Sequence, residues 1–131
     1  MSDFGTTRVA ATHSEVAPDG SEVRPLLRLA AGSMAHFALA PGRTSKAVAH
    51  RTVEELWLVL SGRGELWRWR EGREEVVALE PGVCVSIPRG TRFQFRSLGR
   101  GALHIVGATM PPWPGAHEAV PVEGRWRPTV A

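Results

Sequence analysis

Short apolar segments, each ended by a glycine-containing turn, set the strongest limit on what this chain can fold into. The segments are five to eight residues long and rich in Val, Leu, Trp and Phe, and pairs such as Pro-Gly, Ser-Gly and Arg-Gly separate them. A helix would instead need an apolar stripe that recurs every three to four residues over a longer window. Short strands at spacings of roughly ten residues predict an all-β domain of antiparallel sheets. The nine predicted strands are residues 24–30, 33–40, 46–50, 55–60, 64–70, 74–79, 83–87, 92–97 and 102–109.

The length fits a single domain of this kind. A chain of 131 residues buries roughly two-thirds of the surface of its unfolded form, so it needs neither disulfides nor a structural metal to fold. We expect residues 21–110 to form the barrel and the polar residues 1–20 to be flexible. Residues 111–131 are rich in Pro and Trp, and we expect them to form an extended strap packed on the barrel.

Composition argues against nucleic acid and membrane as partners. The net charge is +3, and the fifteen Arg and single Lys are scattered among Glu residues rather than clustered, as a nucleic-acid footprint would require. The longest strongly apolar run, residues 56–60, is far below the roughly 20 residues of a membrane-spanning helix. Residues 1–20 hold no apolar signal core, and the single cysteine, Cys84, excludes an intrachain disulfide. We therefore expect a cytoplasmic protein.

Strand alternation assigns the side chains to faces. In residues 92–97 Phe93 and Phe95 share one face, whereas the other is polar and predicted to be wet. Around residues 56–60 both faces are apolar, so a barrel interior would bury only one of them. A second copy of the chain is the simplest cover for the other face, which predicts a homodimer. The chain's own termini are the competing explanation.

Two glycine-bounded motifs link the chain to a known family. In the first, Gly42 is followed by His50, Glu55 and Gly62. In the second, Gly82 is followed by Pro88 and Gly90. The spacings resemble the two motifs of the cupin family, over roughly residues 41–97. This resemblance implies an all-β, cupin-type antiparallel jelly-roll β-barrel, usually dimeric, with a central pocket.

The resemblance also implies a metal, and there the sequence departs from the pattern. The family's four ligand positions, two His and a Glu in the first motif and a His in the second, hold Val48, His50, Glu55 and Phe93 here. Val and Phe have no lone pair to donate, and iron or catalytic zinc sites use at least three protein ligands. We expect no cofactor, or a divalent transition metal held weakly by His50 and Glu55.

Other residues with donor atoms do not replace the two missing metal ligands. If Phe37 and Leu39 face the interior, parity turns His36 away from it. If Leu103 and Ile105 face it, parity turns His104 away as well, so both are predicted to be exposed or interface histidines. Cys84 lies in an apolar segment and is predicted to be a small buried residue.

What remains is a histidine and a carboxylate in an aromatic-lined pocket, the usual form of a small-molecule site. His50 and Glu55 could orient a polar group of a ligand or transfer protons, or they could be a mutually satisfied pair with no ligand. The aromatic residues could equally fill a core. The predicted ligand-binding residues are His50, Glu55, Trp57, Phe93, Phe95, Val48, Trp67 and Ser45.

Three functions are compatible with these residues. The first is a protein that binds a small organic molecule through a degraded metal site, without established catalysis. The alternative is a metal-dependent enzyme of the dioxygenase or isomerase type that uses His50, Glu55 and an unidentified ligand. A third is an interaction domain whose exposed sheet docks another protein. No catalytic residue is assigned.

Overall fold

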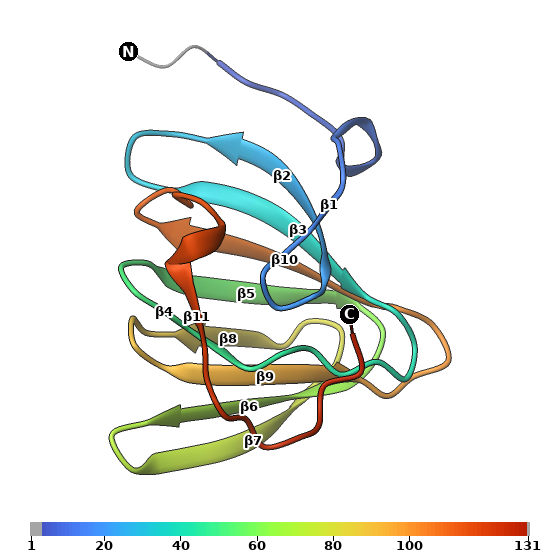
Figure 1. Ribbon diagram of the computed structural model, residues 1–131. Helices are drawn as coiled ribbons and strands as arrows, with labels where there is room; N and C mark the ends of the chain where they lie inside the picture. The colour runs from blue at the N-terminus through green and yellow to red at the C-terminus, as the bar shows by residue number, and fades with distance from the viewer. Residues whose placement is uncertain (1–3, 131) are drawn as a thin grey trace.

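The structure, a computed structural model, describes residues 4–130, and its regular secondary structure consists of strands and two single turns of 3₁₀ helix (Figure 1). This confirms the all-β prediction. The strands are β1 (Glu15–Val16), β2 (Glu22–Arg28), β3 (Ser33–Leu39), β4 (Val48–His50), β5 (Glu54–Ser61), β6 (Gly64–Arg70), β7 (Arg73–Leu79), β8 (Cys84–Ile87), β9 (Arg92–Ser97), β10 (Leu103–Met110) and β11 (Ala119–Pro121). The 3₁₀ turns are η1 (Val9–Ala11) and η2 (Ala116–Glu118).

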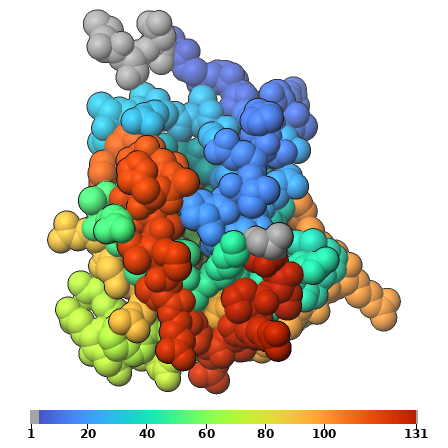
Figure 2. Space-filling model, in the orientation of Figure 1, coloured from blue at the N-terminus to red at the C-terminus, as the bar shows by residue number. Residues whose placement is uncertain are grey.

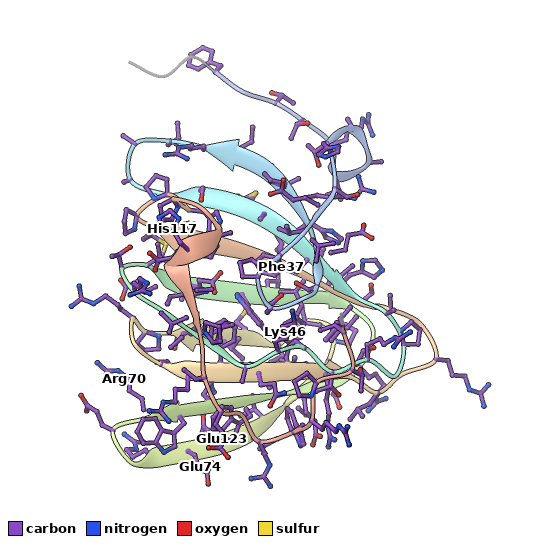
Figure 3. All side chains as sticks on the ribbon, in the orientation of Figure 1. Phe37, Lys46, Arg70, Glu74, His117 and Glu123 are labelled. Atoms are coloured by element: carbon purple, nitrogen blue, oxygen red, sulfur yellow. The ribbon has the colours of Figure 1, made fainter. Side chains whose placement is uncertain are left out.

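The strands form two antiparallel sheets. One has the order β1-β2-β3-β10-β5-β8 and the other β11-β4-β9-β6-β7. The chain crosses between the sheets several times, so that β10 lies between β3 and β5, and β9 between β4 and β6. This is the jelly-roll arrangement. Figure 3 places Arg70 and Glu74 at the β6–β7 hairpin, on the opposite side of the molecule from β1 and β2.

All nine predicted strands are present, with each end within two residues of its predicted position. The spacing of turns therefore located the strands well. Two further strands, β1 and β11, were not predicted. They are two and three residues long, too short to show a period-two pattern, and they are held by pairing with β2 and β4.

The inward faces of the two sheets meet in one core. In β5 the burial alternates along the strand, with Glu55, Trp57 and Val59 buried and their neighbours exposed, as the period of a strand requires. Each fully buried Leu, Ile or Phe contributes roughly 1.5–3 kcal/mol relative to an exposed one. The most completely buried core side chains are Leu39, Val59, Leu66, Leu79, Ile87, Phe93, Phe95, Leu103 and Ile105.

Gly62, the last glycine of the first motif, closes the turn between β5 and β6. Its φ is 87°, in the left-handed region, and a Cβ at this position would lie 2.5 Å from the carbonyl oxygen of Ala102. Both facts exclude a larger residue without local rearrangement. The motif spacing therefore has a steric cause: it fixes the length of β5 between Glu55 and its turn.

The C-terminal chain crosses the outer face of the five-stranded sheet and covers part of it, leaving the β6–β7 hairpin uncovered (Figure 2). Gln94 of β9, on the face predicted to be wet, is 0% exposed because the backbone of Trp126 lies over it. The Gln94 amide donates to the carbonyls of Ser45 and Trp126, both at 2.8 Å, and its oxygen accepts from the Trp126 N–H at 2.9 Å. The prediction of a solvated face was wrong here, since alternation could not show what the chain end would cover.

The outer face of the six-stranded sheet is left apolar. Leu56, Leu58 and Leu60 are 53%, 37% and 47% exposed, and the C-terminal chain lies on the other sheet, so it does not cover them. Cys84 on the edge strand β8 is exposed, and the prediction that it is buried was wrong because its side chain falls on this outer face.

The two histidines of the same face contact each other. His36 and His104 point outward, as parity predicted, but His36 is buried because the two rings stack at 5.2 Å, with 3.1 Å between Nε2 of His36 and Nδ1 of His104. Within residues 4–130 no helix is long and apolar enough to cross a membrane.

Candidate functional site

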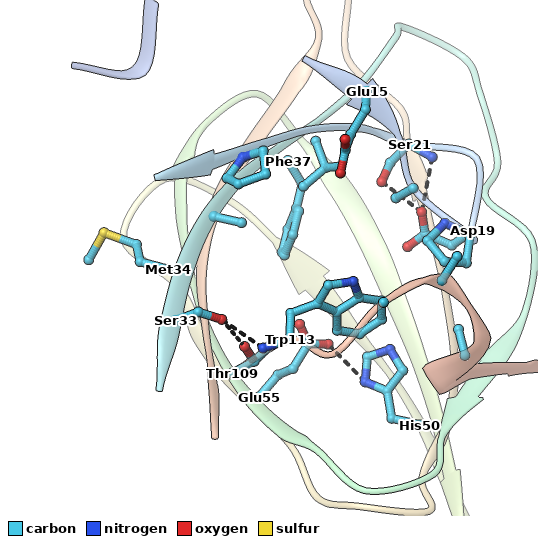
Figure 4. A pocket seen from close by; sticks show the side chains of 18 of the residues that line it. Glu15, Asp19, Ser21, Ser33, Met34, Phe37, His50, Glu55, Thr109 and Trp113 are labelled. Atoms are coloured by element: carbon cyan, nitrogen blue, oxygen red, sulfur yellow. Dashed lines mark hydrogen bonds and ion pairs between the residues drawn. The ribbon is translucent and has the colours of Figure 1, made fainter. Parts of the chain in front are cut away.

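A cavity of about 430 Å³ opens between the two sheets (Figure 4). That volume is in the range of small-molecule sites. Its walls come from the segment 15–19, from β2 and β3, from the inward residues of β4, β5 and β9, and from the segment 113–116 after β10. Five of the predicted site residues line it together: Val48, His50, Glu55, Trp57 and Phe93.

The turn between β4 and β5 brings His50 and Glu55 together. His50 ends β4, and Glu55 is the second residue of β5, where alternation turns it inward and leaves Glu54 exposed. His50 Nδ1 lies 3.4 Å from Glu55 Oε2, and the side chains are only 7% and 4% exposed. The contact does not make a hydrogen bond, so Nδ1 is buried without a partner.

Burial keeps both members of this pair uncharged at neutral pH. Desolvation, helped by the negative charge of Asp19 and opposed by the Trp57 indole, raises the pKa of Glu55 to about 8. Desolvation lowers the pKa of His50 to about 4, although the carboxylate of Glu118 acts in the opposite direction. The pair is therefore a carboxylic acid beside a neutral imidazole.

Glu118 holds the turn that positions the pair. Its carboxylate accepts from the Thr52 N–H at 2.6 Å, the Thr52 hydroxyl at 2.6 Å and the Val53 N–H at 3.0 Å. Desolvation opposes ionisation of Glu118, but these hydrogen bonds outweigh it and lower its pKa. Glu118 is thus an ionised, buried anchor from the C-terminal chain.

Trp113 forms the roof over His50. The two rings are 5.2 Å apart at 68°, and Phe93 contacts the His50 ring from another side at 5.1 Å and 80°. The backbone N–H of Trp113 donates to the Ser33 hydroxyl at 3.0 Å, and that hydroxyl is 2.6 Å from the hydroxyl of Thr109. These contacts fasten the roof to β3 and β10.

The loop between β1 and β2 supplies a second carboxyl group. Asp19 lines the cavity and accepts from the N–H and the hydroxyl of Ser21 at 3.0 and 2.7 Å. Desolvation raises the pKa of Asp19 despite these hydrogen bonds. The carbonyl of Asp19 accepts from the Lys46 N–H at 2.8 Å, which fixes the loop against the chain leading into β4.

Trp57 packs among aromatic rings, and its indole N–H makes no regular hydrogen bond. Its ring lies 5.7 Å from Phe37, 5.8 Å from Phe93 and 5.2 Å from Phe95. Gly107 on β10 makes room for it, since a Cβ there would lie 2.8 Å from Phe37 and 3.1 Å from Trp57. The indole Nε1 of Trp57 is buried and makes no hydrogen bond of regular geometry, although it acts on the nearby carboxyl group of Glu55 and lowers its pKa. A buried polar group in this state costs free energy unless something else satisfies it.

Three predicted site residues lie outside the cavity. Trp67 pairs with Gln94 and therefore lies on the outer face of its sheet, where its Nε1 donates to Glu74 at 2.7 Å. Phe95 lies deeper in the core against Trp57. Ser45 is fully buried but bonded to backbone, donating to the Lys46 carbonyl and accepting from the Phe95 N–H.

The residues present do not fit the metal that the family pattern implies. In the part of the chain that the structure describes, no three His, Cys, Asp or Glu side chains gather as a metal would require. At the family's ligand positions only His50 and Glu55 carry donors, while Val48 and Phe93 present hydrocarbon to the same spot. Stable sites for iron or zinc use at least three protein ligands.

Several cavity residues were not identified from the sequence. Asp19 and Thr109 lie in no motif, and neither does Glu118, which is not part of the cavity wall but holds the turn behind it; their positions depend on how chain ends and neighbouring strands pack. Trp113 was expected only to anchor the C-terminal strap. The Pro-Pro-Trp-Pro run was its only sequence signal.

Comparisons with known proteins agree with this geometry. The family model for the cupin domain matches residues 35–108. Among solved structures, the chain is similar to the capsular polysaccharide assembling protein CapF from Staphylococcus aureus, with a TM-score of 0.72 and 19% identity over 86% of this chain and 34% of that one. It is also similar to oxalate decarboxylase from Bacillus subtilis, with a TM-score of 0.75 and 16% identity over 92% of this chain and 34% of that one.

A third similar structure is the cupin domain of Cnp3 from Schizosaccharomyces pombe, with a TM-score of 0.68 and 9% identity over 80% of this chain and 68% of that one. The chain spans about a third of the length of the CapF and oxalate decarboxylase chains. At these identities the likeness shows the fold alone. No curated protein sequence matches the chain.

Proposed function

The chain belongs to the cupin family, and on this basis we propose that it binds a small, partly apolar organic molecule in the cavity around His50 and Glu55. The observation that carries the proposal is an aromatic-lined cavity whose wall holds two buried polar atoms, His50 Nδ1 and Trp57 Nε1, that make no hydrogen bond of regular geometry and have only the carboxyl group of Glu55 nearby. Nearly all buried polar groups in native proteins find a partner, and a ligand is one way to supply it.

The shape of the cavity supports the same proposal. Most of its wall is apolar, with Phe37, Trp57, Phe93 and Trp113 presenting aromatic surface and a few polar groups converging among them. That combination orients a small molecule and excludes water from it. His50 and Glu55 would contact the polar end of the ligand. The proposal includes no catalytic step.

A second proposal concerns the exposed apolar face of the six-stranded sheet. We propose that a second copy of the chain covers Leu56, Leu58 and Leu60, since these side chains form an exposed apolar stripe on the six-stranded sheet. Neither nucleic acid nor a membrane is part of the proposal. A cytoplasmic location stays a prediction from the sequence.

A cavity-filling substitution tests the proposed function. Ala35 and Ala38 lie on the same strand, but only Ala35 lines the cavity. In saturation-transfer NMR with a library of small aromatic molecules, the wild-type protein should bind members of the library, Ala35→Leu should lose that binding, and Ala38→Leu should keep it.

Metal content is measured on the same samples. Elemental analysis should find no stoichiometric transition metal, and a chelator should leave the melting temperature unchanged. Binding that Ala35→Leu does not affect would contradict the proposed cavity. A stoichiometric metal whose removal lowers the melting temperature would favour the metal-dependent enzyme instead.

A further inference from the structure

The cavity that the proposed function uses carries more carboxyl groups than cationic groups. Glu15, Asp19 and Glu55 line it, against a single guanidinium, that of Arg28. Arg28 already donates to the carbonyl of Trp113 at 3.4 Å. An anionic ligand would therefore face the carboxyl groups of Glu15, Asp19 and Glu55 (Figure 4), while the guanidinium among the lining residues is already hydrogen-bonded.

The carboxyl groups of Glu55 and Asp19 have no cationic partner within ion-pair distance. Among the ion pairs of residues 4–130, Glu55 contacts only the neutral ring of His50, and Asp19 takes part in none. The charge of Lys46 acts on Asp19, but Lys46 is not part of the cavity wall. Buried acids without a counter-cation are costly unless they stay protonated. A cation brought by a ligand would allow these carboxyl groups to ionise inside the cavity.

The aromatic walls favour the same kind of ligand. Cations are attracted to the faces of Trp and other aromatic rings, and organic ammonium ions are recognised in cages of such rings beside carboxylates. Here Phe37, Trp57, Phe93 and Trp113 surround the space that Glu55 and Asp19 border. In Figure 4 the ring of Trp113 lies between Phe37, Asp19 and His50.

A bare metal cation would meet these requirements less well than an organic one. It would find only His50 and Glu55 as close donors at one spot, and it would gain nothing from four apolar rings. An organic ammonium ion needs hydrogen-bond acceptors for its N–H groups and apolar surface for its body, and the cavity supplies both.

This inference rests on the proposed function and names the class of its ligand. We propose that the cavity recognises an organic ammonium ion with an aromatic or alicyclic body, whose charged group meets Glu55 and Asp19 and whose body packs against Trp113 and Phe37. Once Glu55 is ionised by the bound cation, the indole N–H of Trp57, which makes no regular hydrogen bond in the free protein, can donate to its carboxylate. The bound cation and the indole N–H would then stabilise the same carboxylate.

Three probes with the same apolar body test the inference: 2-phenylethylammonium, the neutral 2-phenylethanol and the anionic 3-phenylpropanoate. Affinities are measured by calorimetry at pH 7, where the amine is protonated. The ammonium should bind at least about tenfold more tightly than the alcohol, and the carboxylate should not bind. Glu55→Gln and Asp19→Asn should each weaken ammonium binding about tenfold and leave the alcohol unchanged. Glu54→Gln, on the outer face, is the matched control and should change neither.

Each outcome decides between this inference and the proposed function. If the alcohol binds as tightly as the ammonium, or if Glu55→Gln and Asp19→Asn leave the ammonium unaffected, the ligand class is wrong while the cavity remains a binding site. If none of the three probes binds at millimolar concentration, the proposed function fails as well. If zinc or manganese binds stoichiometrically and displaces the ammonium, the cation of the site is a metal and the inference is overturned.

Discussion

At the scale of single residues, the parity of one strand decides the chemistry of the site. Glu54 and Glu55 are adjacent and identical in type, yet one is exposed and the other is 5% exposed. Only the buried one meets His50. The sequence predicted this difference, because alternation and the distance to Gly62 both select Glu55. It could not predict that burial would leave the carboxyl group protonated, since that depends on how completely the surrounding rings exclude water.

The protonated state of Glu55 gives the protein a specific pH dependence. Between pH 6.5 and about 8 the folded chain holds a proton on Glu55 that the unfolded chain, with a carboxyl pKa of 4.5, has released. The free energy of unfolding should therefore fall as the pH rises through this window, by up to about 2 kcal/mol. Between pH 4.5 and 6.5 the lowered pKa of His50 gives the opposite slope, so the decrease due to Glu55 is offset there.

Urea denaturation at several pH values measures this effect. Glu55→Gln should abolish most of the fall between pH 6.5 and 8, and the difference from wild type isolates Glu55 from the raised pKa of Asp19. Glu54→Gln should keep the wild-type profile. A Glu55→Gln protein whose stability still falls as steeply would show that another group holds the proton.

At the scale of elements, the strands follow from the sequence more completely than the site does. Turn spacing located nine strands, and motif spacing brought Val48, His50, Glu55 and Phe93 to one cavity. Trp67 was placed wrongly because alternation tells which residues share a face but not which face is inside. The register decides that: Leu66 pairs with Phe95, and Trp67 therefore points outward. Asp19 and Glu118 lie in segments with no period, where no pattern could assign them a direction.

The hydrogen bonds between Glu118 and the turn at Thr52 and Val53 lead to a prediction at this scale. Replacing Glu118 with Ala removes the acceptor for the backbone N–H groups of Thr52 and Val53, the latter in a fully buried residue. We expect a loss of about 1–3 kcal/mol in the free energy of unfolding. Ligand binding should weaken too, because the same turn sets the distance between His50 and Glu55.

The exposed Glu123 provides the comparison on the same chain end. Glu123→Ala should change stability by less than about 0.5 kcal/mol. Both variants are compared by chemical denaturation, and binding by the NMR assay above. If the Glu118→Ala and Glu123→Ala proteins had the same free energy of unfolding, the turn would keep its shape without the hydrogen bonds to Glu118.

At the scale of the whole molecule, the two sheets present different outer faces. The five-stranded sheet is partly covered by its own C-terminal chain, with the Arg96 guanidinium 4.3 Å from the ring of Trp126. Within residues 4–130 no segment covers Leu56, Leu58 and Leu60 of the six-stranded sheet in this way, and they stay exposed on it. The sequence left two explanations for this apolar face open, and the chain's own C-terminus is now excluded as its cover.

A charge at the centre of that face should prevent association. Leu58 pairs across the sheet with Val106, so an arginine there would be buried without a partner in a two-fold dimer. Light scattering coupled to size exclusion should give twice the 14.2 kDa chain mass for wild type and a single chain for Leu58→Arg. Leu98→Arg, at an exposed loop position, should remain dimeric. A wild-type protein that is monomeric at tens of micromolar would contradict the proposed second copy.

The roof and one wall of the cavity come from outside the stretch that matches the family model. Residues 15–19 precede it, and Trp113 and the segment up to Ala116 follow it. If the cavity binds a ligand as proposed, substitutions in the segments on either side of that stretch would change its selectivity without disturbing the pairing of the sheets. Differences in ligand specificity between related chains should therefore lie in the segments before and after the stretch that they share.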